Sequence, residues 1–134
     1  GVPRDVRGDK ISRLLKEYGL SHLEDTKAVS LSGGERRRVE IARCLALEPL
    51  FILLDEPFSG IDPIAVADLQ SIIRELKERG YGILLTDHNV HETLSITDRA
   101  YLIYEGKVFL EGKPDYITEN KDARKFYLGE DFSW

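Results

Sequence analysis

The sequence predicts an α/β fold built from parallel βαβ units, with a β-hairpin and short helices towards the C-terminus. Two apolar runs, 51–55 and 81–86, have the length and continuous hydrophobicity of parallel strands buried on both faces. Between them, residues 62–80 carry apolar side chains at helical spacing. This strand, helix, strand order favours a right-handed crossover between parallel neighbours.

The N-terminal part is expected to contain two helices. Residues 1–8 are rich in turn formers and are expected to be mobile, and a helix follows from Asp9, a good N-cap, to Gly19. Residues 20–31 show no periodic pattern and are expected to be irregular. A second helix is expected over about 33–47, because a proline follows two residues later.

The remaining elements follow from caps, turns and periodicity. The third helix should begin after Asp62, a suitable N-cap, and end at Gly80. Beyond the second strand, Glu105-Gly106 suits the tight turn of a hairpin that we expect to extend one edge of the parallel sheet. The other short elements are a helix over 89–97, strands over 100–104 and 107–110, and helices over 115–118 and 122–128.

Composition narrows the possible classes of protein. The 134 residues are 42% hydrophobic and 32% charged, which is typical of a globular protein, and the formal net charge is −5. An acidic chain argues against general nucleic-acid binding. The single cysteine, Cys44, cannot form an internal disulfide, and no apolar run approaches the roughly 20 residues needed to span a bilayer. Any membrane contact is therefore expected to run through partners.

Two carboxylates lie at the end of a predicted parallel strand, where side chains can contact a bound ligand. Asp55 and Glu56 end the first apolar run, and ligands of open α/β folds bind at the carboxyl edge of the sheet. Their side chains should point in different directions, because side chains alternate along a strand. One carboxylate can hold a magnesium ion and the other can activate a water. The simpler alternative is a pair of acidic residues that cap the next turn.

A glycine pair opens the second helix. Gly33 and Gly34 let the backbone approach a phosphate closely, Ser32 adds a hydroxyl donor, and a helix N-terminus offers unpaired N–H groups. A capped helix after a glycine turn would have the same pattern. The arginines that follow, at 36, 37, 38 and 43, are interpreted as a solvated face or as electrostatic support for bound phosphates.

Taken together, these segments resemble the motifs of ABC-type ATPases. Leu31–Glu35 is similar to the signature motif, Phe51–Glu56 to the Walker B motif, and Ser59–Asp62 to the D-loop. His88, which follows the second strand, is similar to the H-loop histidine. The D-loop departs mildly from the commoner form, with Gly60 and Ile61 where alanine and leucine are usual.

The resemblance implies a role for each of these residues. Asp55 would hold magnesium, Glu56 would be the catalytic base and His88 the switch histidine. Two further groups would act at a subunit interface. The signature group, which binds ATP held by the opposite subunit, is Ser32, Gly33, Gly34 and Glu35, and the D-loop group is Ser59, Gly60 and Asp62.

The resemblance also implies a P-loop NTPase-like fold and a protein that extends before residue 1. No G-x-x-x-x-G-K-[ST] phosphate loop occurs in the chain, so we expect the N-terminal half of the ATPase to be missing. Residues 1–47 would then end the helical subdomain, and 48–134 would form the C-terminal part of the RecA-like core with a helical tail. The fragment alone is expected to be inactive.

The implied complex is a homodimer that uses ATP and Mg²⁺ with transmembrane permease subunits, without nucleic acid, on the cytoplasmic face of the inner membrane. Within the family, the stretches 86–94 and 127–132 resemble the ATPases of lipopolysaccharide exporters. The alternatives are ATPases of branched-chain amino acid importers and DNA-repair ABC ATPases. The loop 57–63 favours the transporter type over the DNA-repair type.

Overall fold

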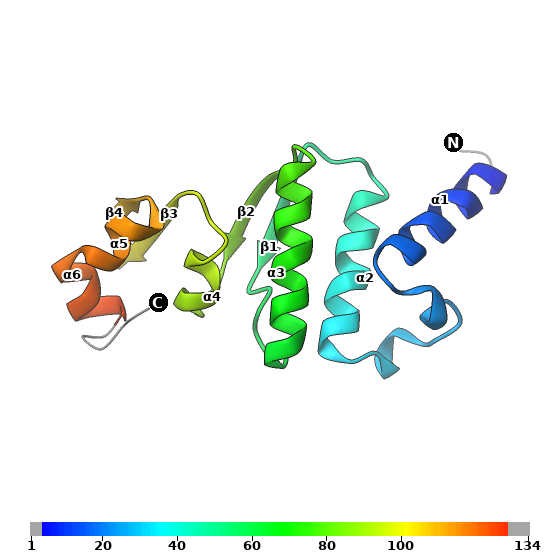
Figure 1. Cartoon of the computed structure of the whole chain (residues 1–134), viewed down its shortest axis with the longest axis horizontal. Helices are drawn as coiled ribbons and strands as arrows, with labels where there is room; N and C mark the ends of the chain where they lie inside the picture. The colour runs from blue at the N-terminus through cyan, green and yellow to red at the C-terminus, as the bar shows by residue number, and fades with distance from the viewer. Residues whose placement is uncertain (1–3, 129–134) are drawn as a thin grey trace. The chain divides into compact units, whose positions relative to one another are not determined.

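The structure is a computed structural model that describes residues 4–128. The chain divides into two compact units, one ending at Thr86 and the other beginning at Asp87. The residues 129–132 of the terminal stretch that resembles lipopolysaccharide exporters lie outside the described part. Figure 1 shows the order of the elements along the chain.

The N-terminal unit contains three helices and two strands among its described residues. In order they are α1 (Arg4–Glu17), α2 (Gly33–Leu45), β1 (Phe51–Asp55), α3 (Pro63–Glu78) and β2 (Gly82–Thr86). The expected irregular segment between α1 and α2 contains two short 3-10 turns, Ser21–Leu23 and Ala28–Ser30. These elements agree with the predicted order of helices and strands.

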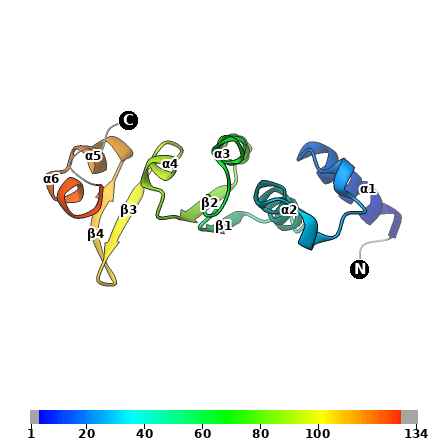
Figure 2. The ribbon, with the colours of Figure 1, turned by 90° about the horizontal axis from the view of Figure 1, so that it is seen from below.

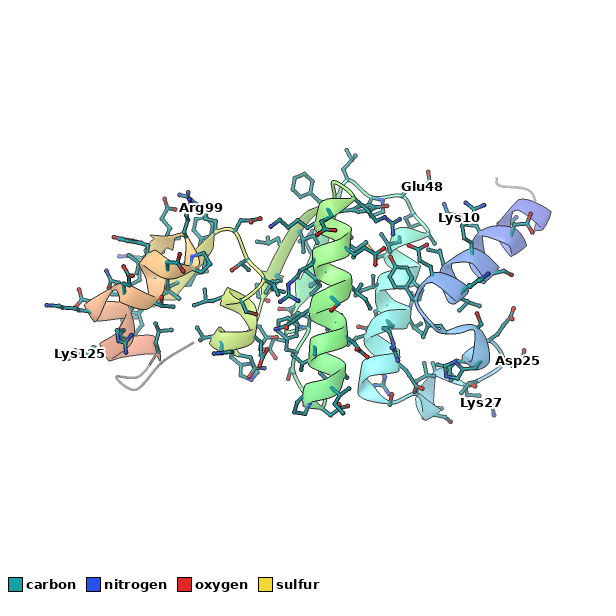
Figure 3. The ribbon with its side chains drawn as sticks, in the orientation of Figure 1. Lys10, Asp25, Lys27, Glu48, Arg99 and Lys125 are labelled. Carbon is teal, nitrogen blue, oxygen red and sulfur yellow. The ribbon has the colours of Figure 1, made fainter. Side chains whose placement is uncertain are left out.

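The start of α1 differs from the prediction. The helix begins at Arg4 rather than at Asp9, so the expectation of a turn-rich segment is wrong for residues 4–8. A glycine inside a helix costs only about 1 kcal/mol relative to alanine, and Gly8 is accommodated there. Lys10 of α1 forms an ion pair of 2.7 Å with Glu48, the third residue after α2 (Figure 3).

The two central strands confirm the parallel prediction. β1 pairs with β2 in parallel from Phe51 opposite Gly82 to Asp55 opposite Thr86. α3 connects the two strands and covers one face of the pair, as Figures 1 and 2 show from two directions. Its buried residues are Val66, Leu69, Gln70, Ile73 and Leu76, and Ile52 on β1 is 1% exposed.

The opposite face of the strand pair is apolar, and no other element in the described residues of the N-terminal unit covers it. Phe51, Leu53 and Leu84 are 70%, 73% and 57% exposed. The expectation of strands buried on both faces is therefore wrong for the described residues. Hydrophobic side chains on both faces are typical of strands between two layers, and the described part of the N-terminal unit supplies such a layer, α3, on one side.

The C-terminal unit is built on a hairpin. Its elements are α4 (Val90–Leu94), β3 (Ala100–Tyr104), β4 (Lys107–Gly112), α5 (Pro114–Glu119), α6 (Lys121–Ala123) and a π-helical turn, Arg124–Leu128. The core of this unit is Leu94, Leu102, Ile117 and Ala123, with Val90, Ala100, Leu110 and Leu128 packed against it. The helix expected over 89–97 is shorter, ending at Leu94.

The hairpin turn confirms one prediction and corrects another. Glu105 and Gly106 both have positive φ, 48° and 73°, as the type I′ turn common between antiparallel strands requires. β3 and β4 form a two-stranded sheet of their own in the described part of the chain, rather than extending the edge of β1 and β2. The short turn pairs these strands locally, so they need no partner from the parallel pair.

Helix length and hydropathy bear on membrane insertion. Among the residues that the structure describes, no helix is both long and apolar enough to cross a membrane.

Candidate functional site

The end of β1 presents Asp55 and Glu56 at the carboxyl edge of the parallel pair, where the sequence predicted them. Both residues are exposed. Thr86, directly opposite Asp55 on β2, donates a hydrogen bond from Oγ1 to Asp55 Oδ1 at 2.5 Å. Thr86 was not among the residues predicted to be functional. Its place at the end of the neighbouring apolar run was the available signal.

The backbone turns sharply at Glu56. Its φ of 45° lies in the left-handed region, which is uncommon for a residue other than glycine. The Glu56 N–H donates to the Thr86 carbonyl at 2.7 Å, and its carbonyl accepts from the Ser59 N–H at 3.1 Å. Pro57 and Phe58 follow as buried residues, and Phe58 is 2% exposed. They anchor the loop that leaves the strand.

An arginine from α2 reaches the same turn. Arg37 Nη2 donates to the Glu56 carbonyl oxygen at 3.1 Å, and its Nη1 donates to Glu40 Oε2 at 2.8 Å. Arg37 was predicted to lie on a solvated face or to support bound phosphates. The contact with Glu56 joins residues 19 positions apart, and no local pattern indicates it.

The N-terminus of α2 is closed by a capping box. Ser32 Oγ accepts from the Glu35 N–H at 3.3 Å, and Glu35 Oε2 accepts from the Ser32 N–H at 2.8 Å. The first two N–H groups of the helix, on Gly33 and Gly34, have no acceptor within the helix. The segment can therefore be capped and still offer donors to an anion.

The cap also lowers the pKa of Glu35. Its pKa is held below the ordinary value, first because the Ser32 backbone N–H donates to the carboxylate and then because of its contact with the Ser32 side chain. His22 Nε2 lies 3.9 Å from Glu35 Oε1 and acts in the same direction. The carboxylate that the resemblance assigns to nucleotide binding thus takes part in the helix cap.

The glycine pair has a second role that the sequence analysis missed. A Cβ at Gly33 would lie 2.8 Å from Ile61 Cγ2, and a Cβ at Gly34 would lie 2.8 Å from Ala65 Cβ. Real Cβ atoms do not approach other atoms this closely, so only glycine fits at this contact. The start of α2 therefore packs directly on the turn before α3 and on its first residues.

The segment that resembles the D-loop forms this turn. Gly60 has a φ of 69°, and Asp62 Oδ1 accepts from the N–H groups of Ile64 and Ala65 at 3.0 Å each. Asp62 is thus the N-cap of α3, as predicted. The structure brings the Ser32–Glu35 segment and the Ser59–Asp62 segment together within the N-terminal unit.

His88 belongs to the C-terminal unit. Its side chain is 66% exposed, and its Nδ1 lies 3.7 Å from Asp87 Oδ1. The buried Asp87 carboxylate accepts from the Asn89 N–H at 2.9 Å. The assignment of His88 as a switch histidine stays a prediction.

The role of Asp55 as a magnesium ligand stays a prediction. No group of three or more His, Cys, Asp or Glu side chains in residues 4–128 could hold a metal ion. Mg²⁺ is commonly held by one or two carboxylates together with substrate phosphates. The Asp55 carboxylate is exposed, and its bond with Thr86 leaves further lone pairs for such a cation.

The sequence is similar to ABC transporter proteins. Residues 4–59 match the family model described as ABC transporter. The chain is 54% identical over 129 residues to a probable ABC transporter ATP-binding protein of Azorhizobium caulinodans, covering 96% of this chain and 46% of that protein. It is 56% identical over 126 residues to the lipopolysaccharide export system ATP-binding protein LptB of Acidithiobacillus ferridurans, covering 94% and 52%.

A solved structure agrees. The ADP conformation of an ATP-binding cassette from an ABC transporter matches 96% of this chain and 52% of its own length, at 30% identity and a TM-score of 0.85. The chain spans about half the length of the curated relatives that it matches.

Proposed function

We propose that the full-length protein is an ATPase that couples ATP hydrolysis to transport, because this chain belongs to the ABC transporter family. One observation carries the proposal. Asp55 and Glu56 project from the carboxyl end of a parallel strand pair, in the same unit as a glycine-opened helix N-terminus. A carboxylate pair and a phosphate-binding helix end are two of the parts that phosphoryl transfer to water requires.

In the proposed mechanism, Glu56 accepts a proton from the water that attacks the γ-phosphorus, while the bond from that phosphorus to ADP breaks. Asp55 would hold Mg²⁺, which neutralises charge on the phosphate oxygens when bound. Ser32 and the N–H groups of Gly33 and Gly34 would donate to the γ-phosphate of ATP held by a second copy of the protein. A homodimer with two shared nucleotide sites follows.

The remaining assignments belong to the same proposal. His88 would donate to the γ-phosphate, and Ser59, Gly60 and Asp62 would lie at the dimer seam. Residues 1–47 would end a helical subdomain, and residues 48–134 would complete the ATPase core. The exposed apolar face of β1 and β2 would then pack against further sheet of the full-length protein.

Residues 1–134 alone are expected to show no ATP hydrolysis and only weak ATP binding, because they contain no phosphate-loop motif to hold the β- and γ-phosphates. The measurement is phosphate release and ATP titration of this fragment beside the full-length protein. Circular dichroism of the fragment provides the folding control. Hydrolysis by the fragment that Glu56→Gln removes would contradict the expectation.

We further propose that the transported substrate is lipopolysaccharide. The support is the similarity to proteins named as lipopolysaccharide export system ATP-binding proteins, at 51–56% identity over nearly the whole chain. The protein would then be peripheral on the cytoplasmic face of the inner membrane, bound to transmembrane permease subunits.

The substrate proposal predicts a specific complex. Affinity-tagged full-length protein should co-purify with its permease subunits, and the complex in proteoliposomes should release lipopolysaccharide to an acceptor in an ATP-dependent way. Full-length protein with Glu56→Gln serves as the transport-dead control. ATP-dependent uptake of a branched-chain amino acid by the same complex would instead assign the protein to an importer.

A further inference from the structure

The backbone at the Asp55–Glu56 turn is in a conformation that needs support. Glu56 has a φ of 45°, and a non-glycine residue persists in the left-handed region only when its surroundings hold it there. Such positions occur often at active sites, where the conformation aims a side chain. Identifying what holds this turn therefore identifies residues that place the proposed catalytic groups.

Thr86 holds the turn from β2. Its hydroxyl donates to Asp55 Oδ1 at 2.5 Å, and its carbonyl accepts from the Glu56 N–H at 2.7 Å. One residue thus fixes both the carboxylate of Asp55 and the backbone of Glu56. The parallel register, which sets Asp55 opposite Thr86, makes both contacts possible.

Arg37 holds the turn from α2. One arm of the guanidinium donates to the Glu56 carbonyl and the other to the Glu40 carboxylate one turn further along the helix. The planar, forked guanidinium suits two such acceptors at once, whereas an ammonium has no fixed fork. The backbone of Glu56 is therefore bonded on its N–H side to β2 and on its carbonyl side to α2.

We propose that Thr86 and Arg37 are positioning residues for ATP hydrolysis: Thr86 orients the Asp55 carboxylate, and Arg37 fixes the peptide that carries the Glu56 side chain. This inference rests on the proposed function. Neither residue needs to touch ATP, since each acts through a neighbour. Arg37 also joins the turn to the helix whose N-terminus serves the opposite subunit, so displacement of α2 would be transmitted to Glu56.

The test for Thr86 uses three variants of the full-length protein. Thr86→Val keeps the β-branched shape and removes the hydroxyl, and Thr86→Ala is a second hydroxyl-free variant should the valine fail to fold. Each should lower kcat by about 10- to 100-fold and raise the Mg²⁺ concentration for half-maximal activity, as loss of an outer-shell partner does. Thr86→Ser restores the hydroxyl and should stay within about threefold of the unmodified protein.

The test for Arg37 compares an alanine and a lysine variant with a variant at an exposed arginine of α3. Arg37→Ala should lower kcat by about tenfold or more, because misplaced reacting groups slow chemistry, while the Kd for ATP stays unchanged. Arg37→Lys, which can make one of the two contacts, should fall between. Arg74→Ala is the control, since Arg74 is an exposed arginine of α3 and should keep full activity.

Several outcomes would overturn the inference. Equal losses in Thr86→Val and Thr86→Ser would show that the hydroxyl is irrelevant. Equal kcat in Arg37→Ala and Arg74→Ala would show that the guanidinium contact is irrelevant. A rise in the Kd for ATP with unchanged kcat would assign either residue to binding instead. If the unmodified protein shows no Glu56-dependent hydrolysis, the proposed function fails together with the inference. If the unmodified protein is active and the Thr86 and Arg37 variants have the same kcat, the inference alone fails.

Discussion

Glu56→Gln in the full-length protein is expected to lower ATP hydrolysis by about 100- to 10,000-fold, the range that loss of a general base produces. Glutamine keeps the size of the side chain and the left-handed backbone, so the bonds of the Glu56 N–H and carbonyl are retained. ATP binding should stay within about twofold, because the base acts on water rather than on the bound nucleotide. Single-turnover phosphate release and ATP titration measure the two effects separately.

Glu48→Gln is the matched control for this substitution. Glu48 is also an exposed glutamate with positive φ, at 52°, but it lies before β1 rather than after it and pairs with Lys10. Its change should leave hydrolysis within about twofold, since exposed ion pairs contribute little. Equal activity of the Glu56→Gln and Glu48→Gln proteins would remove Glu56 from the mechanism.

Gly34→Ala is expected to destabilise the protein by about 1–3 kcal/mol, the range for overpacking, and to lower hydrolysis by tenfold or more. The new Cβ would lie 2.8 Å from Ala65 Cβ, which is attached rigidly to α3, so α2 and α3 must separate. A shift of about 1 Å at the N-terminus of α2 would misplace the donors proposed for the opposite nucleotide, and misplacement of that size can cost about 100-fold. Thermal unfolding and phosphate release measure the two effects.

Gly8→Ala distinguishes packing from helix propensity. Gly8 lies inside α1, and a Cβ there would meet nothing within 4 Å. Replacing this glycine should stabilise the helix by up to about 1 kcal/mol, so the two identical substitutions should change stability with opposite signs. Stabilisation by Gly34→Ala with full activity would show that the close contact with Ala65 is unimportant.

Much of the local structure could be predicted from short patterns. β1 and the N-cap of α3 at Asp62 follow from the apolar run and the Asp-Pro pair, and β3 and its turn follow from Glu105-Gly106. The parallel pairing was predicted from element order. The start of α1 was not, because Gly8 and Asp9 resemble a helix boundary and nothing local shows that the helix continues through them.

The site was predicted less completely than the elements. The carboxylates and the glycine pair are visible in the sequence because each belongs to one continuous motif. The roles of these residues in packing and in supporting the site are not visible in the sequence. The capping function of Glu35 and the close approach of Gly33 to Ile61 emerged from the structure, although the serine and glutamate three residues apart were a usable signal for the cap.

The sequence by itself determined which segments form helices and strands and which strand ends in carboxylates, because propensity, capping and periodicity act over one or two turns of chain. Only the tertiary structure decided that Thr86 holds Asp55 across 31 residues and that Arg37 holds Glu56 across 19. Contacts of that kind depend on strand register and on which helix faces meet. Those follow from the packing of whole elements, so no short stretch of sequence encodes them.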